Sequence, residues 1–145
     1  MVRPFSAASL LVALAAVASF TAACSNTTSP STAPTFTKTD IRDGSGAAAA
    51  TGNTLTVNYT GWLYDATKPE QKGLVFDTSL GRSAFTFVLG GQQVIAGWDQ
   101  GLVGMKVGGL RRLIVPPSMA YGSTRVSRIP PDATLVFEVE LLDVK

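Results

Sequence analysis

Four segments of the chain alternate hydrophobic and polar residues with a period of two. They are residues 54–62 (TLTVNYTGW), 84–90 (AFTFVLG), 110–116 (LRRLIVP) and 134–144 (TLVFEVELLDV). This alternation predicts antiparallel strands that cover a core with one face and leave the other face polar. Turns are indicated by the segments rich in Gly, Pro and Asp at residues 42–46, 51–53 and 129–134.

A helical period replaces this alternation in residues 92–109 (QQVIAGWDQGLVGMKVGG). Its larger hydrophobic residues recur as on one face of a helix, at Val94, Ile95, Trp98, Leu102 and Met105. Five glycines interrupt this stripe, and each Gly inside a helix costs about 0.5–1 kcal/mol relative to Ala. We therefore expect a short helix that forms only because it packs against something larger.

These patterns together predict the fold class. It is α+β, with a curved antiparallel β-sheet wrapped around one short α-helix, in a domain that spans residues 36–145. A curved sheet leaves little room where it crosses the helix. We expect Gly97 and Gly101 to allow the close approach, and Trp98 to fill the space between helix and sheet.

The first 35 residues have a different composition. Arg3 precedes an apolar run at residues 7–20, which is shorter than the ~20 residues that span a bilayer. This pattern predicts a signal peptide over residues 1–23. Residues 24–35 are rich in Ser, Thr and Pro and have no charge, so we expect an extended tether.

Cys24 directly follows the predicted signal peptide. The segment TAAC at residues 21–24 resembles a bacterial lipobox, in which this Cys receives a diacylglyceryl group and becomes the new N-terminus. On this interpretation Cys24 is lipidated, and the protein is a membrane-anchored lipoprotein outside the cytoplasm, in the periplasm or on the cell surface. The alternative is secretion after residue 23 with Cys24 as a free thiol, which would be a liability in an oxidising compartment.

The composition excludes several kinds of chemistry within this chain. It has no His and a single Cys, so Ser-His-Asp and Cys-His catalysis, Cys/His zinc sites and an internal disulfide are all ruled out. We expect neither a metal nor a cofactor. A net charge of +2 gives no support for nucleic-acid binding. The adjacent pair Arg111 and Arg112 is predicted to be a solvated strand edge and not a phosphate site.

Five motifs follow one another in a characteristic order. They are VNYTGWL, FDTS, FTFVLGGQQVIAGWDQGLVGMKVGG, AYG and IPPDATLVFEVELLDV. Together they resemble the FKBP-type peptidyl-prolyl cis-trans isomerases, over nearly all of residues 36–145. The resemblance implies a half-barrel sheet around a short helix, as the hydrophobic pattern does independently. It also implies rotamase activity on X–Pro bonds, here in exported proteins.

The resemblance further implies an apolar proline pocket whose floor is Trp98. The residues that it assigns to catalysis are Asp77, Tyr121, Trp98 and Phe137. Those that it assigns to substrate binding are Tyr59, Phe76, Phe85, Val94, Ile95 and Ile129. Six of the ten aromatic residues that follow residue 23 belong to this set, which is more than scattered core packing would give. From the residues alone, Trp98 could still be ordinary core, and Asp77 could be a turn residue that caps the segment DTS.

The chemistry of the reaction suits this inventory of residues. Rotation about the amide bond meets a barrier of about 18–20 kcal/mol and requires no nucleophile. The twisted amide carries less charge separation than the planar one, so a dry apolar pocket disfavours the ground state. We expect the backbone N–H of Ile95 to anchor a substrate carbonyl and the Tyr121 hydroxyl to be a second donor. Asp77 would orient the twisted imide or Tyr59.

Partners are implied by the same resemblance. They are proline-containing polypeptides and macrolide inhibitors of the FKBP class, and a monomer is expected. Relative to minimal members, residues 63–76 carry an insertion and the loop at residues 122–128 is shortened, and both segments border the pocket mouth in the family. Two other functions remain possible: a proline-binding or chaperone module with little turnover, and a solute-binding lipoprotein, which the single small domain disfavours.

Overall fold

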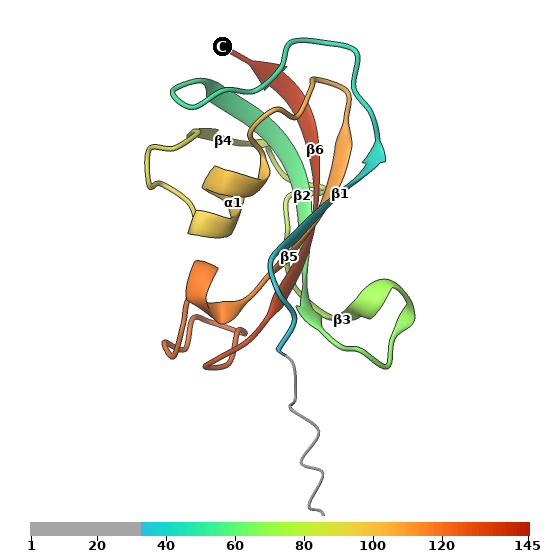
Figure 1. Ribbon diagram of the computed structural model, residues 1–145, viewed down its shortest axis with the longest axis vertical. Helices are drawn as coiled ribbons and strands as arrows, with labels where there is room; N and C mark the ends of the chain where they lie inside the picture. The colour runs from blue at the N-terminus through green and yellow to red at the C-terminus, as the bar shows by residue number, and fades with distance from the viewer. Residues whose placement is uncertain (1–32) are drawn as a thin grey trace, which may run out of the picture. The chain divides into compact units, whose positions relative to one another are not determined.

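The computed structural model describes residues 33–145. The predicted signal peptide, Cys24 and most of the predicted tether lie outside these residues, and residues 33–36 have no regular secondary structure. Figure 1 shows a strongly bent sheet with the one α-helix of these residues on the inner side of the bend. Within residues 33–145, every helix is too short or too polar to cross a bilayer.

Six strands, all paired antiparallel, form the sheet. Their bounds are β1 Thr37–Arg42, β2 Thr54–Tyr64, β3 Lys72–Thr78, β4 Phe85–Val88, β5 Leu110–Val115 and β6 Leu135–Val144. The order across the sheet is β1-β5-β6-β2-β3, and β4 pairs with the first half of β2, beyond the end of β3. The helices are α1 Ala96–Gly101 and the short 3-10 turns η1 Pro69–Gln71 and η2 Pro117–Met119. The predicted fold class is confirmed.

All four strands predicted from alternation are present, each within about two residues of its expected bounds. In β5, for example, Arg111, Leu113 and Val115 are buried while the residues between them are only partly buried. Strands β1 and β3 were not predicted. Every residue of β1 is exposed, so it shows no alternation, and most of β3 lies in the segment 63–76 that was interpreted as an insertion. The helix is confined to six residues, and Gly104, three residues beyond its end, adopts a positive φ angle of 78°, which a continuing α-helix does not allow.

Helix α1 packs against β5 at a distance that only glycine allows. A Cβ atom added to Gly97 would lie 2.4 Å from a Val115 methyl carbon, and one added to Gly101 would lie 2.7 Å from a Leu113 methyl carbon. Trp98, between these two glycines, is 4% exposed. The helix is therefore held by its packing and not by its intrinsic propensity, as the glycine-rich sequence predicted.

The prediction for Arg111 was wrong. Strand β5 lies between β1 and β6, and Arg111 is a buried residue. Its guanidinium donates to the Asp40 carboxylate at 2.5 and 3.1 Å, and to the backbone carbonyls of Gly101 and Val103 at 2.7 and 3.1 Å. The alternation of β5 puts Arg111 on the same buried face as Leu113 and Val115, and these four bonds offset the cost of burying its charge there. One side chain thus joins β5, β1 and the end of α1.

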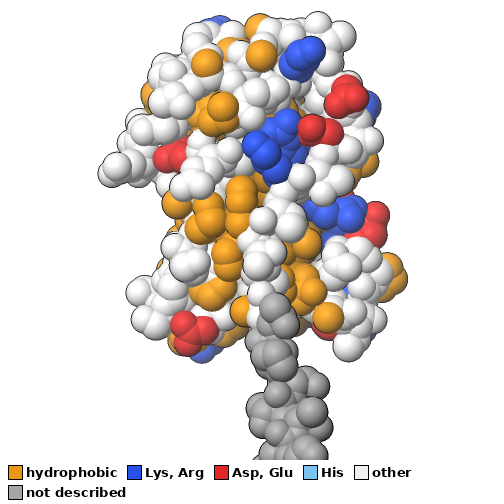
Figure 2. All heavy atoms as spheres, in the orientation of Figure 1, with side chains coloured by type: hydrophobic (Ala, Val, Ile, Leu, Met, Phe, Trp, Pro, Cys, Tyr) orange, Lys and Arg blue, Asp and Glu red, His pale blue; other side chains and the backbone are white. Residues whose placement is uncertain are grey.

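The segment around η1 is joined to the sheet by a network of four charges. Lys72 and Arg112 each contact both Glu70 and Glu138, at N–O distances of 2.6 to 3.0 Å, and the Lys72 ammonium also lies 4.6 Å from the centre of the Trp62 ring. Networks of this kind stabilise more than isolated surface pairs do. Figure 2 likewise shows basic and acidic side chains close together on the face that it presents.

We predict that Gly97→Ala destabilises the domain although alanine is the better helix former. The new methyl group would press on Val115, and such overpacking costs about 1–3 kcal/mol in the free energy of unfolding. Urea denaturation measures this free energy. The control is the cycle with Val115→Ala: the double variant should lose less stability than the two single variants summed. A Gly97→Ala domain as stable as the wild type would contradict the packing argument.

Candidate functional site

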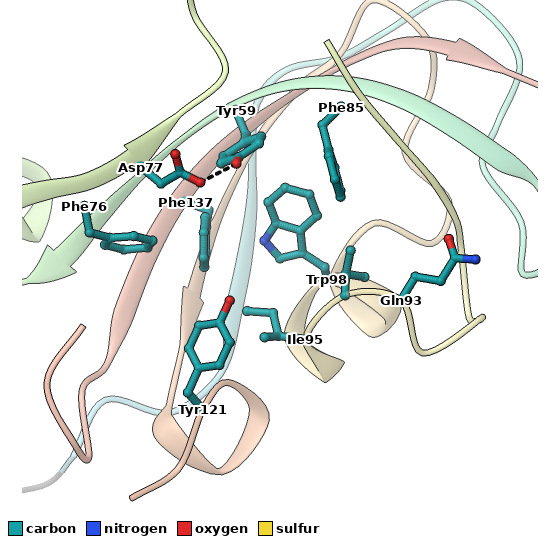
Figure 3. A pocket seen from close by; sticks show the side chains of 10 residues that line it. Tyr59, Phe76, Asp77, Phe85, Gln93, Ile95, Trp98, Tyr121 and Phe137 are labelled. Carbon is teal, nitrogen blue, oxygen red and sulfur yellow. Dashed lines mark hydrogen bonds between the residues drawn. The ribbon is translucent and has the colours of Figure 1, made fainter. Parts of the chain in front are cut away.

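A cavity of about 160 Å³ opens between α1 and the inner face of the sheet. Figure 3 shows its aromatic side chains converging from four strands, from α1 and from the segment after η2. Its lining comprises Tyr59, Phe76, Asp77, Phe85, Gln93, Val94, Ile95, Trp98, Tyr121 and Phe137. Nine of the ten residues assigned to the pocket from the sequence therefore meet around one cavity. The tenth, Ile129, is buried and lines an adjacent cavity that shares Phe76, Asp77 and Tyr121.

Trp98 lies at the centre of this aromatic cluster. Its ring meets Tyr59, Phe85 and Phe137 edge to face, with centroid distances of 5.1, 6.2 and 5.4 Å, and Phe87 supports it from below the cavity lining at 5.6 Å. Such T-shaped pairs stabilise beyond the area that they bury. The rings therefore hold one another in fixed orientations, and the walls of the cavity are rigid.

The indole N–H of Trp98 is the unusual polar group of the site. Its Nε1 is buried and has no hydrogen-bond partner among the described residues. Figure 3 shows the nitrogen on the edge of the indole that faces Phe137. The positive edge of one ring then meets the negative face of the other, which offsets part of the cost of the unpaired N–H. The cavity floor is consequently apolar in effect, although it contains a donor.

Phe76 reaches the cavity because β3 is irregular there. Gly61 of β2 pairs with Asp77, whereas the next residue, Trp62, pairs with Val75, so Phe76 is an extra residue in β3. Bulges of this kind redirect a side chain. A Cβ atom on Gly61 would lie 2.5 Å from the Phe76 ring. Gly61 was not predicted as a site residue, although the wall of the pocket depends on its lack of a side chain.

Asp77 is the only carboxylate of the cavity lining, and three groups hold it. Its Oδ2 accepts a hydrogen bond of 2.5 Å from the Tyr59 hydroxyl, and its Oδ1 accepts from the Thr78 backbone N–H at 2.9 Å. Arg82 forms an ion pair with the same carboxylate at 2.7 Å. Asp77 thus caps the turn and also orients Tyr59, so the two interpretations made from the sequence do not exclude each other.

These contacts set the protonation states of the site. Burial alone would raise the pKa of Asp77, but the hydrogen bonds from Tyr59, Arg82 and Thr78 outweigh it and hold that pKa below its ordinary value. Burial, and then the Asp77 hydrogen bond, raise the pKa of Tyr59 to about 12. Burial and the Asp77 charge raise the pKa of Tyr121 as well. At neutral pH the carboxyl is therefore ionised, while both hydroxyls keep their protons and act as donors.

Two donors at the cavity have no hydrogen-bond acceptor among residues 33–145. One is the backbone N–H of Ile95, the residue that directly precedes α1. The other is the Tyr121 hydroxyl, which points toward the other aromatic rings of the pocket in Figure 3. Both are therefore free to bind a carbonyl oxygen. Within the same residues, no group of three or more His, Cys, Asp or Glu side chains could hold a metal ion.

Two polar residues near the cavity were not predicted as site residues. Gln93 lines the cavity, and its side-chain oxygen accepts a hydrogen bond of 2.9 Å from the Val88 N–H, which ties the approach to α1 onto β4. Arg82 is the partner of Asp77. Its position in the turn after FDTS is the one feature that could have indicated this pairing.

Comparisons with known proteins agree with this geometry. Residues 46–142 match the family model described as "FKBP-type peptidyl-prolyl cis-trans isomerase". A protein named "FK506-binding protein" from Neisseria meningitidis serogroup A is 50% identical over 107 residues, which are 72% of this chain and 92% of the relative.

Two solved structures share the fold. FkpA from Escherichia coli superposes with a TM-score of 0.65 at 43% identity, covering 76% of this chain and 48% of that one. AtFKBP13 superposes with a TM-score of 0.64 at 32% identity, covering 76% and 93% of the two chains. Together with the family model and the Neisseria relative, these likenesses show that the chain belongs to the FKBP-type peptidyl-prolyl cis-trans isomerase family.

Proposed function

We propose that this isomerase accelerates X–Pro rotation by holding the proline ring on Trp98, inside the aromatic cavity. The observation that carries this proposal is the ring of aromatic side chains around Trp98, which offers a rigid apolar surface with free donors at its rim. A cavity of about 160 Å³ is several times the ~30 Å³ share of one water molecule. It therefore has room for a pyrrolidine ring once its water is displaced.

Catalysis then follows from differential binding. A planar X–Pro amide has charge separated between oxygen and nitrogen, and the twisted amide has lost most of it. Aromatic walls solvate the planar form poorly, so its free energy rises relative to the transition state. The Ile95 N–H holds one substrate carbonyl in place while the other side of the bond turns. The Tyr121 hydroxyl donates to a second carbonyl in the twisted geometry.

Asp77 acts in this proposal through its charge and through Tyr59. Its carboxylate lines the cavity that would hold the imide, and Arg82 and Tyr59 keep it ionised and fixed. A fixed negative charge beside the imide carbonyl oxygen would disfavour the planar form, in which that oxygen carries partial negative charge, and would thereby lower the barrier to twisting. Phe137 and Phe76 meet edge to face at 5.5 Å and keep water away from this side.

We place the enzyme outside the cytoplasm, where it would assist slow proline-limited folding steps of exported proteins. The apolar run at residues 7–20, Cys24 and the tether rich in Ser, Thr and Pro support this assignment. A lipid anchor on Cys24 would keep the domain at a membrane while the tether gives it reach. The related proteins are named for binding FK506, and we extend this macrolide affinity to the same pocket here.

The test of the function is the cis/trans exchange rate of a short proline peptide, measured by NMR with and without the domain. We expect wild-type protein to accelerate exchange, and Tyr121→Phe to lower kcat/KM about 5-fold to 30-fold, because a hydrogen bond made in the transition state is lost. Tyr64→Phe removes a hydroxyl outside the cavity and is the matched control. If wild-type protein binds the peptide without changing its exchange rate, the domain is a proline-binding module with little turnover.

Asp77→Asn separates the electrostatic role of Asp77 from its role in the turn. Asparagine can still cap the turn but carries no charge, so we expect kcat/KM to fall about 3-fold to 10-fold, as for a charge-assisted hydrogen bond that becomes neutral. Binding of FK506, followed through Trp98 fluorescence, should change little. Asp65→Asn alters another carboxylate that caps its own turn, at Thr67, and controls for capping. An unchanged exchange rate in Asp77→Asn would reduce Asp77 to a turn residue.

Cys24→Ser tests the proposed anchor. Without the thiol no lipid can be attached, so the protein should move from the membrane to the soluble fraction or accumulate as the uncleaved precursor. Cell fractionation and intact mass measure both results, with Ser25→Ala as the neighbouring control. A wild-type mature protein whose mass shows an unmodified Cys24 would falsify lipidation.

A further inference from the structure

A second depression continues from the aromatic pocket along the surface. It consists of two adjoining cavities, of about 280 and 360 Å³, that share Phe76, Asp77, Ser127 and Arg128. We call this depression the side groove. Strand β3 forms one wall, and the loop at residues 126–129 forms the other. Phe76, Asp77 and Tyr121 line both the pocket and the groove. A peptide whose proline occupies the pocket would therefore extend directly into the groove.

The loop wall of the groove is a fixed structure. Val126 and Ile129 exchange two backbone hydrogen bonds, of 3.1 and 2.8 Å, which close a tight turn with Ser127 and Arg128 at its tip. Ile129 is buried and anchors the turn in the core. Ser127 has a φ of 51°, a strained conformation of the kind that clusters at functional sites. The backbone of Arg128 is therefore held beside the groove and is not free to move with a long loop.

The charges along the groove do not cancel. Its charged side chains are Asp77, Arg82 and Arg128. Asp77 and Arg82 form an ion pair with each other at 2.7 Å, whereas Arg128 makes no ion pair with any residue in the range 33–145. One positive charge therefore remains at the mouth of the groove, on an exposed side chain that can reach an incoming group.

We propose that the side groove binds the residues that flank the proline, and that Arg128 selects substrates with an acidic side chain there. The occupant is thus an extended, acidic segment of a proline-containing polypeptide. Its carboxylate would pair with the Arg128 guanidinium, which is suited to bidentate contact. The inference rests on the proposed function, because the groove is reached by a peptide only if the proline enters the aromatic pocket.

The test uses three peptides that differ only in charge, of sequence Gly-Z-Leu-Pro-Z-Gly with Z as Glu, Gln or Lys. Placing Z on both sides makes the result independent of the direction in which the peptide binds. The measured quantity is the ratio of kcat/KM for the Glu peptide to that for the Lys peptide. For wild-type protein at low salt, we expect a ratio of about 3 to 10. Exposed ion pairs are weak, but Arg128 would attract the Glu peptide and repel the Lys peptide, and both effects raise the ratio. High salt should bring it close to unity.

Arg128→Glu should invert the preference, so that the Lys peptide becomes the better substrate. Arg125→Ala is the matched control, because Arg125 is exposed in the same loop but lines neither cavity, and it should keep the wild-type ratio. Titration of the same peptides, followed through Trp98 fluorescence, gives their dissociation constants. The ratio of the affinities for the Glu and Lys peptides then measures selection in binding, whether or not turnover is seen.

The outcomes separate the two claims. A wild-type ratio near unity in both exchange and binding, with the Gln peptide still turned over, overturns the selection by Arg128 and leaves the isomerase intact. The selection by Arg128 is also overturned if Arg128→Glu leaves the ratio unchanged, or if Arg125→Ala abolishes the preference. If no peptide is turned over but the binding ratio inverts in Arg128→Glu, the groove stands and the proposed function fails.

Discussion

The close contact between helix α1 and strand β5 is the constraint on which the rest of the domain depends. Gly97 and Gly101 leave no side chain between helix and sheet, so the helix lies directly against Val115 and Leu113. That depth brings Trp98 into the concavity of the sheet, where four other aromatic rings contact it. If the helix lay farther from the sheet, the same rings would not meet, and the cavity would lose its floor.

The polar groups of the site are arranged around this apolar centre in two ways. Asp77 and Arg82 satisfy each other and fix Tyr59, so they add order without adding net charge. The Ile95 N–H and the Tyr121 hydroxyl stay without an acceptor among the described residues, and they cost little there because the rim of the cavity is open to water. The satisfied polar groups therefore give the site its order, and the unsatisfied donors stay available at the cavity.

How much the sequence predicted depends on where each interaction partner lies. The strands with one buried face were found, because alternation records burial residue by residue, and the glycine-rich helix was found by its stripe. Strand β1 was missed because none of its residues is buried, and the burial of Arg111 was missed because its partner, Asp40, is 71 residues away.

The pocket residues were predicted from the resemblance to a known family, and nine of these ten residues line one cavity. The residues alone could not decide whether Trp98 was core or binding surface, and it is in fact both buried and part of the cavity lining.

The bulge in β3 has a consequence beyond the pocket. Strand β3 ends the sheet, so its outer backbone groups face no partner strand among the described residues, and Leu74 and Val75 are exposed beside them. A regular edge with such residues would invite another extended chain to add to the sheet. The extra residue at Phe76 breaks the regular spacing of those groups. One irregularity thus gives the domain both a wall of its aromatic cavity and a sheet edge that is less able to pair with another extended chain.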